Sequence, residues 1–243
     1  MLGESIMSES ITVMIQQAKK SWLTWNEINI HQRIGITAQW GERLKDNPNI
    51  GDMPAHVIEF HNRQAISLIA ESQMMPGPTG ESNILSTSGR GIFLMMMEES
   101  SSIPALVGLL NCALIAGNSV LLLSNSDNKE IVSSLQQACS LTGVEMPVFI
   151  VKEKEALQAI ISEPSIAGVG YVGNETEAIS LNQALAARTG QIAQLIAETD
   201  LALLPTVRDQ HLVLRFITEK TLSTNVTAVG GNATLLALGC GEQ

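Results

Sequence analysis

Hydrophobic positions between residues 89 and 199 form short unbroken runs separated by amphipathic stretches. The runs are GIFLMMM, SVLLLS, PVFIVK, AGVGYV and IAQLIAE. The stretches between them, about residues 103–116, 128–141, 154–161 and 176–187, repeat their apolar residues at helical spacing. Continuous aliphatic strands that alternate with helices are typical of a parallel sheet covered on both faces. We therefore predict an α/β fold, with a doubly wound, Rossmann-like sheet over residues 76–207.

The first 75 residues carry a different pattern. Apolar positions at helical spacing, including Trp22, Trp25 and Trp40, run from about residue 11 to 44, and a second helix is predicted over residues 55–71. Asn, Pro and Gly in DNPNIGDMP separate the two, because these residues favour turns. PGPTG at 76–80 then predicts a connector, since its prolines lack backbone donors. Residues 1–75 are thus expected to form a helical segment ahead of the sheet.

The C-terminal part alternates apolar and polar residues. In HLVLRFITEKTLS the polar positions include His211, Arg215 and Thr218, an alternation that predicts a strand with one exposed face. We expect residues 208–224 to form an extended β-flap, and residues 208–243 to comprise this flap and a glycine-rich tail. The edge of such a flap can pair with another sheet.

Composition excludes several classes of function. A formal net charge of −10 argues against a nucleic-acid partner, because phosphate binding needs a basic surface. The apolar run IPALVGLLNCALIAG is shorter than the ~20 residues of a membrane span, and the N-terminus lacks the pattern of a signal peptide. Three widely spaced cysteines, Cys112, Cys139 and Cys240, suit reduced thiols, so we expect a cytoplasmic protein.

Candidate chemistry is sparse. Neither G-x-G-x-x-G nor G-x-x-x-x-G-K-[ST] occurs, so neither common phosphate-binding loop is predicted. Glu198 ends the last aliphatic run, at the sheet edge where ligands bind in such folds. It is either a general base or a carboxylate that accepts backbone hydrogen bonds, and the residues alone favour the second role.

The stretch EESSS at 98–102 follows the first predicted strand of the sheet. Ser100 and Ser102 are candidate nucleophiles, but a helix N-terminus explains them better, because Ser is a preferred cap and acidic residues favour that end of a helix. Glu98 and Glu99 would also repel a pyrophosphate. A metal pair of His56 and His61 is not favoured, because no carboxylate or Cys completes a site. Cys112 and Cys139 have apolar neighbours and are expected in the core.

Several segments resemble the aldehyde dehydrogenase superfamily, and specifically the proline-utilisation A flavoenzymes, which oxidise proline to glutamate. They cover most of the chain after residue 70, and the segment AKKSWLTWNEINIHQRIG shows a weaker similarity to the same family. The PGPTGE-type connector and the GGNA-type tail are more specific than the sheet pattern. The segments are PGPTGESN, GRGIFLMMM, ALIAGNSVLLL, AGVGYVGNETEA, LAARTGQIAQLIAET and NVTAVGGNATLLALG.

The chain departs from the active pattern of that superfamily. The oxyanion-binding Asn of P-W-N-F-P corresponds to about Ser100, and the ribose-binding Lys of A-K-P corresponds to Leu123. Glu198 matches the general base, but Asp200 and Leu201 stand where the family has Gly-Gly. The nucleophilic Cys and its catalytic domain have no counterpart, and acyl transfer through a thiohemiacetal needs that thiolate.

The turn after AGVGYV keeps Gly173 of the family pattern but continues as NETE. The resemblance therefore implies a non-catalytic module like the extra C-terminal domain of longer proline-utilisation A proteins. Such a module packs on the pyrroline-5-carboxylate dehydrogenase domain and helps to close its substrate-channelling cavity. Glu198 would be vestigial, and no cofactor is expected in this chain, although the parent protein would bind FAD and NAD.

The partner implied by the resemblance is the aldehyde dehydrogenase domain of the same protein, or a second copy of the chain through the flap. The alternative is the NAD-binding part of a pyrroline-5-carboxylate or aldehyde dehydrogenase that keeps its cofactor affinity. A third and less favoured hypothesis is a hydrolase that uses a serine of Ser100–Ser102 as its nucleophile. The expected partner interface comprises Asn225, Thr227, Gly230, Gly231 and Asn232.

Overall fold

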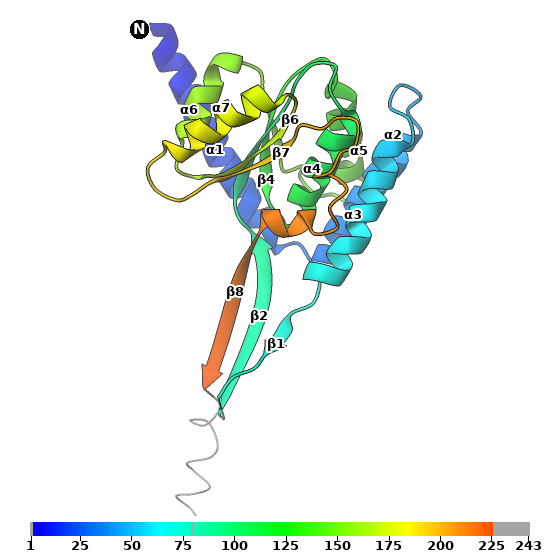
Figure 1. Cartoon of the computed structure of the whole chain (residues 1–243), viewed down its shortest axis with the longest axis vertical. Coiled ribbons are helices and arrows are strands. Elements are labelled where there is room, and N and C mark those ends of the chain that lie inside the picture. Colours follow the sequence, from blue (N-terminus) through cyan, green and yellow to red (C-terminus); the bar gives the residue numbers. More distant parts are fainter. Residues whose placement is uncertain (1, 79, 226–243) are drawn as a thin grey trace, which may run out of the picture.

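A five-stranded parallel sheet in the order β5-β4-β3-β6-β7 forms the centre of the molecule (Figure 1). The computed structural model describes residues 2–78 and 80–225, and side chains from residue 10 onward. Each strand is one of the aliphatic runs and helices connect them, so the predicted doubly wound α/β fold is confirmed. The strands are β3 (Ile92–Met97), β4 (Ser119–Leu123), β5 (Val148–Val151), β6 (Ile166–Val172) and β7 (Gln194–Glu198).

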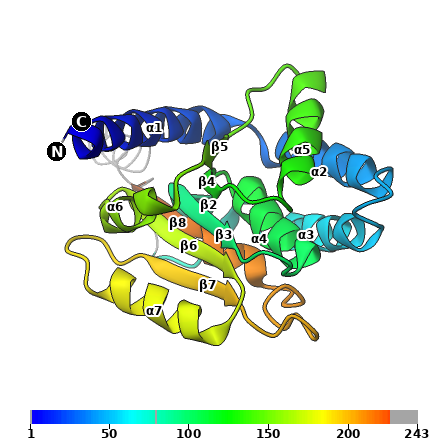
Figure 2. The same ribbon diagram turned by 90° about the horizontal axis from the view of Figure 1, so that it is seen from above.

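Helices cover both faces of this sheet (Figure 2). Alternate residues of a strand face opposite sides, so Phe93 and Met95 lie in one apolar cluster, whereas Leu94 and Met96 lie in the other. Each large aliphatic side chain buried in this way contributes about 1.5–3 kcal/mol. The first face carries α2 (Ile30–Lys45), α3 (Met53–Ile69), α4 (Ile103–Ile115) and α5 (Lys129–Leu141). The second carries α1 (Leu2–Glu27), η1 (Lys154–Ala156), α6 (Leu157–Ser162) and α7 (Glu175–Ala186).

The N-terminal helical pattern is realised as two helices rather than one. The helical spacing from 11 to 44 is interrupted at Asn29, whose backbone is extended and whose side chain accepts a hydrogen bond from the His31 N–H at 2.8 Å. This cap starts α2 in a new direction. The helix predicted over 55–71 is α3, and its ends differ from the prediction by two residues.

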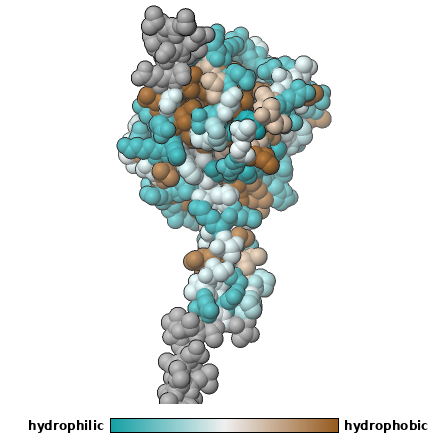
Figure 3. Space-filling model, turned by 90° about the vertical axis from the view of Figure 1, so that its left-hand side faces the viewer, coloured by the Kyte–Doolittle hydropathy of each residue, from teal (hydrophilic) through white to brown (hydrophobic). Residues whose placement is uncertain are grey.

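A three-stranded antiparallel ribbon, which we call the flap, projects from the amino end of the sheet (Figure 1). It consists of β1 (Gln73–Met75), β2 (Glu81–Gly89) and β8 (Ile217–Asn225), in the order β1-β2-β8. β8 pairs with β2 along its nine residues, from Ile217 opposite Gly89 to Asn225 opposite Glu81. Apart from Ile217, the residues of β8 are exposed, and Figure 3 shows the flap as a narrow extension of the body.

The flap differs from its prediction in two ways. Its strand begins at Ile217, because residues 212–216 form a short 3-10 helix, η2 (Leu212–Phe216), that buries Leu212, Val213 and Phe216. The spacing of these three residues fits one helical turn packed on α3 and α4, so the expected strand over 208–224 is wrong before Ile217. Neither β1 nor β2 was predicted, because β1 has only three residues and the Ser-rich β2 lacks a regular alternation of apolar and polar residues.

Two side-chain amides, of the buried Asn118 and the half-buried Asn26, join the flap to the body at the amino end of the sheet. Asn26, at the end of α1, accepts a hydrogen bond from the Gly89 N–H at 2.8 Å and bonds to Ser88. Asn118 accepts from the Gly91 N–H at 2.9 Å and donates to the carbonyl of Phe216, directly before β8. Both strands at the base of the flap are therefore fixed by side chains of the body.

Arg33 of α2 completes this amino-end network. Arg33 is 7% exposed, and its guanidinium donates to the carbonyl of Ile115 at 2.8 Å, at the end of α4. It also donates to the carbonyls of Asn26, in the last turn of α1, and of Ile28, directly after α1. These carbonyls carry the negative end of each helix dipole, which stabilises a cation. Burial lowers the pKa of Arg33 to about 10, so the group remains charged at neutral pH.

Candidate functional site

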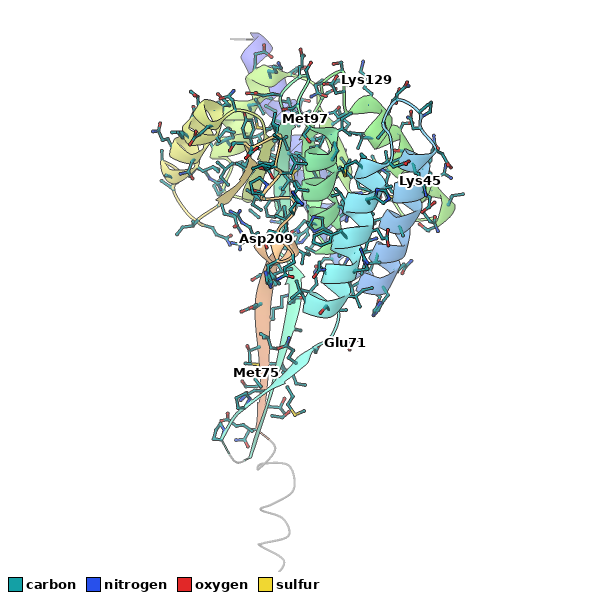
Figure 4. The ribbon with its side chains drawn as sticks, turned by 45° about the vertical axis from the view of Figure 1, so that its right-hand side comes forward. Lys45, Glu71, Met75, Met97, Lys129 and Asp209 are labelled. Carbon is teal, nitrogen blue, oxygen red and sulfur yellow. The ribbon has the colours of Figure 1, made fainter. Side chains whose placement is uncertain are left out.

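The candidate site is the carboxyl edge of the sheet, at the far end of the body from the flap. Figure 4 places Met97 and Lys129, the last residue of β3 and the first of α5, at this end, whereas Met75 lies on the flap. In doubly wound folds ligands bind at this edge, where the strand order reverses. That point lies here between β3 and β6, whose helices α4 and α7 cover opposite faces.

A carboxylate spans the point of reversal. Glu98, directly after β3, accepts a hydrogen bond from the Tyr171 hydroxyl at 2.7 Å. Its other oxygen accepts from the Asn174 N–H at 3.3 Å, at the N-terminus of α7, and the Asn174 side-chain amide donates to the same oxygen as Tyr171. Burial, together with the hydrogen bond to Glu98, raises the pKa of Tyr171 well above its ordinary value. Tyr171 therefore stays a neutral donor.

Gly173 allows this close approach. A Cβ at this position would lie 2.7 Å from the carboxyl carbon of Glu98 and would also meet the Tyr171 hydroxyl. A helix N-terminus at this crevice normally favours the phosphate of a bound ligand. Here an internal carboxylate occupies the place of the anion.

The loop after β4 packs against the loop after β3. Asn125 donates to the carbonyl of Met97 at 3.0 Å and Asn128 to that of Leu123 at 2.7 Å. Ser100, with φ of 60°, donates its N–H to the Asp127 carboxylate at 2.8 Å. This bond lowers the pKa of Asp127, so the contact is strongest when the carboxylate is ionised. The two loops thus bind one another over the edge of β3 and β4.

Glu198 is completely buried at the end of β7. One carboxylate oxygen accepts the Val207 N–H at 3.0 Å, and the other has no hydrogen-bond partner within the described residues. Residues 199–207 cover the side chain, and Asp200 orders this cover by accepting the N–H groups of Ala202 and Leu203. The carboxylate thus accepts a backbone hydrogen bond, the role that the sequence favoured.

The two candidate serines have structural contacts. Ser102 caps α4, since its hydroxyl oxygen accepts the Ala105 N–H at 3.3 Å.

Leu123, at the position of the ribose-binding Lys in the superfamily pattern, is 6% exposed and lies in an apolar cluster. The side chain at this position therefore offers no hydrogen bond to a nucleotide.

The cysteines and histidines are not gathered into a site. Cys112 and Cys139 are free and buried, and burial raises the pKa of Cys112 well above its usual range and that of Cys139 to about 11, so both stay protonated. His61 is buried with its Nε2 2.8 Å from the Val207 carbonyl, whereas His56 lies at a surface cavity. Within residues 2–78 and 80–225, no three His, Cys, Asp or Glu side chains form a group able to hold a metal ion.

Most of the expected partner interface lies outside the described residues. Asn225 is the last residue of β8, but Thr227, Gly230, Gly231 and Asn232, like Cys240, follow the described part. Among the helices that are described, none has both the length and the apolar character that a membrane span needs.

Sequence reasoning missed the contacts that connect β3 with β6. Glu98 was interpreted as an acidic residue at a helix N-terminus that would repel pyrophosphate, and its partners Tyr171 and Asn174 are 73 and 76 residues away. One local signal existed: an acidic residue directly after a strand, and an Asn before a predicted helix. Their proximity follows only from the strand order, which the sequence does not state.

Comparison with known proteins places this geometry in context. No protein-family model matches the chain. The bifunctional protein PutA of Rhizobium meliloti is 28% identical over 187 residues, which are 76% of this chain and 14% of that protein. The chain therefore spans only a small part of its curated relative.

Solved structures give the same result. A proline utilization A (PutA) structure with proline bound in remote sites aligns with a TM-score of 0.68 and 25% identity, over 79% of this chain and 22% of that one. A PutA variant of Bradyrhizobium japonicum is 26% identical, with the same TM-score and the same coverage. Apo indole-3-acetaldehyde dehydrogenase, at 12% identity, has a TM-score of 0.65 over 79% of this chain and 49% of that one, a similarity of fold alone.

The parallel sheet and these alignments show an α/β domain with an aldehyde dehydrogenase-like fold. Within that class the relationship is to PutA, by sequence and by structure. The chain is a PutA-related domain with an aldehyde dehydrogenase-like fold, as its sequence segments predicted.

Proposed function

We propose that the chain is a non-catalytic aldehyde dehydrogenase-like domain of a protein of proline catabolism. In this proposal it packs on a pyrroline-5-carboxylate dehydrogenase domain and helps to close the cavity through which the intermediate passes between active sites. The relatives named PutA, described as bifunctional, supply the context of the reaction. The main observation is the Glu98 carboxylate at the N-terminus of α7, where a nucleotide phosphate would otherwise bind.

Three features argue against catalysis by this edge. Glu98 adds a negative charge and fills space at the crevice. Leu123 offers no polar group at the position expected to contact a ribose, and Glu198 is covered by residues 199–207. A general base must reach the proton that it removes, so a buried Glu198 that accepts a backbone hydrogen bond is poorly placed for this role.

The flap supports the scaffold role. Its strand β8 is exposed along most of its length, and β8 lies at the edge of the three-stranded ribbon. Such an edge can extend a neighbouring sheet through main-chain hydrogen bonds. Asn26 and Asn118 fix the base of the flap to the body, so a partner bound at the flap would be held in a defined orientation.

A titration with NAD separates this proposal from its alternative, a module that keeps cofactor affinity. Calorimetry on the purified chain should give no saturable binding at about 1 mM NAD, a concentration that would detect even a weak nucleotide site. Saturable binding in the micromolar range would establish the alternative.

The scaffold role itself needs an assay of the coupled reaction. In a PutA-type protein that contains this domain, deletion of residues 225–243 should lower the flux from proline to glutamate, while oxidation of added aldehyde and the circular dichroism spectrum stay unchanged. Unchanged coupled flux would contradict the proposal. A matched control is Glu99→Ala at the opposite end of the body, which should leave the flux unaffected.

A further inference from the structure

A surface cavity lies between the first turns of α3 and the segment that follows β7. Its volume is about 430 Å³, and its walls are mostly apolar. A volume of this size falls within the range of small-molecule sites, roughly 300–1,000 Å³. The lining residues are Met53, His56, Val57, Phe60, Ala202, Leu203, Leu204, Val207 and Arg208.

The two basic residues of this lining distinguish it from a simple apolar groove. Within the described part of the chain, no hydrogen bond or ion pair engages the guanidinium of Arg208 or the ring of His56. The adjacent carboxylate of Asp209 instead contacts His211, with its oxygen 3.5 Å from Nδ1.

One wall of the cavity has a fixed and uncommon backbone. Leu204 has φ of 50°, a left-handed conformation that a bulky side chain rarely adopts. It is held by hydrogen bonds from its N–H to the Asp200 carbonyl at 2.8 Å and from the Arg208 N–H to its own carbonyl at 2.9 Å. Strained residues of this kind cluster at ligand sites. The turn also brings Arg208 to the cavity that Leu203 and Leu204 line.

We propose that this cavity binds a small monocarboxylic acid with an apolar body. The carboxylate would contact Arg208, whose planar guanidinium matches two carboxylate oxygens, and His56 would provide a second donor. The hydrocarbon part would lie against Val57, Phe60 and Val207. This site is separate from the carboxyl-edge crevice and does not depend on the proposed scaffold role.

Methyl NMR of the whole chain with hexanoate as the probe tests the proposal at the site itself. Hexanoate should shift the methyl signals of Val57, Leu203 and Val207 with saturation at about 1 mM or below, which is reasonable for a ligand of this size. Acetate lacks the apolar body and hexan-1-ol lacks the charge, so both should bind at least about tenfold more weakly.

Two variants assign the contacts. Arg208→Gln should weaken hexanoate binding at least about tenfold, because a charge-assisted hydrogen bond is lost. Arg63→Gln removes the same charge from an exposed position of α3 that does not line the cavity, and should change the affinity less than about twofold.

The proposal is overturned if hexanoate causes no saturable shift of these methyl groups. It is equally overturned if Arg208→Gln binds hexanoate as well as the unchanged protein does. Both arginines are exposed, so circular dichroism should show that both variants fold.

Discussion

The two ends of the central sheet use polar side chains for different purposes. At the amino end, Arg33, Asn26 and Asn118 are directed at backbone groups and hold the flap, α1 and α4 together. At the carboxyl end, Glu98 and Asp127 join loops that in related folds separate around a ligand. Arg33 and Asn118 of the first network are buried and Asn26 is half-buried, whereas Glu98 and Asp127 of the second are both partly exposed.

The difference shows which end the fold depends on. Loss of a buried group at the amino end would leave carbonyls without partners in a region from which water is excluded. Loss of a group at the carboxyl end would let water take its place. Stability should therefore respond strongly to changes at the amino end, and ligand binding to changes at the carboxyl end.

The largest effect is expected at Arg33. Arg33→Met keeps much of the apolar stem but removes the donors to the carbonyls of Ile115 and Ile28, so it should lower the free energy of unfolding by about 3 kcal/mol. Urea denaturation measures this change. The exposed Arg63→Met is the matched control and should cost less than about 0.5 kcal/mol. Equal losses in the two variants would remove the contrast between buried and exposed groups.

A smaller effect on stability is expected at His61, whose ring contacts the Val207 carbonyl in the segment between β7 and the flap. Burial lowers the pKa of His61 from 6.5 to about 4. Between pH 4 and pH 6.5 the unfolded chain binds a proton that the folded chain does not. The contribution of the neutral His61 ring to the free energy of unfolding is therefore complete above pH 6.5 and decreases as the pH falls towards 4. The expected loss between pH 7 and pH 5 is about 2 kcal/mol.

Comparison of variants isolates this pH dependence from that of the carboxylates. His61→Gln has no titrating ring and should lose about 2 kcal/mol less than the unchanged protein between pH 7 and pH 5. His56→Gln, at an exposed position, should keep the full pH dependence. If the free energy of unfolding depends on pH in the same way in His61→Gln and in the unchanged protein, His61 takes up its proton without loss of stability, which would contradict this prediction.

The smallest change in stability, with the largest change in binding, is expected at Glu98. Glu98→Ala removes acceptors of Tyr171 and Asn174 at the partly exposed crevice, and should cost about 1 kcal/mol. The N-terminus of α7 then becomes available to an external anion. Calorimetry should detect pyrophosphate binding to Glu98→Ala but not to Glu99→Ala, which removes the same charge from a neighbouring exposed position. No gain over the unchanged protein would argue against Glu98 as the group that occupies the anion position.

The sequence determined the central sheet and the superfamily resemblance with good accuracy. The five aliphatic runs are β3 to β7, because a strand buried on both faces is apolar at most of its positions. The helical stretches between them were also found, since a helix packed on a sheet repeats its apolar residues at a fixed spacing. Local patterns of this kind depend on neighbours a few residues apart, and one sequence contains them completely.

Other features were decided by tertiary structure alone. β2 became a strand through nine pairs with β8, whose residues are 128 to 144 positions away. Residues 212–216 formed a helical turn because α3 and α4 bury it, although their sequence suggested a strand. Glu98 reached Asn174 only because β3 and β6 are neighbours. Pairing partners and crevice contacts depend on which distant segments meet, and a pattern of hydrophobic and polar residues along the chain does not encode that choice directly.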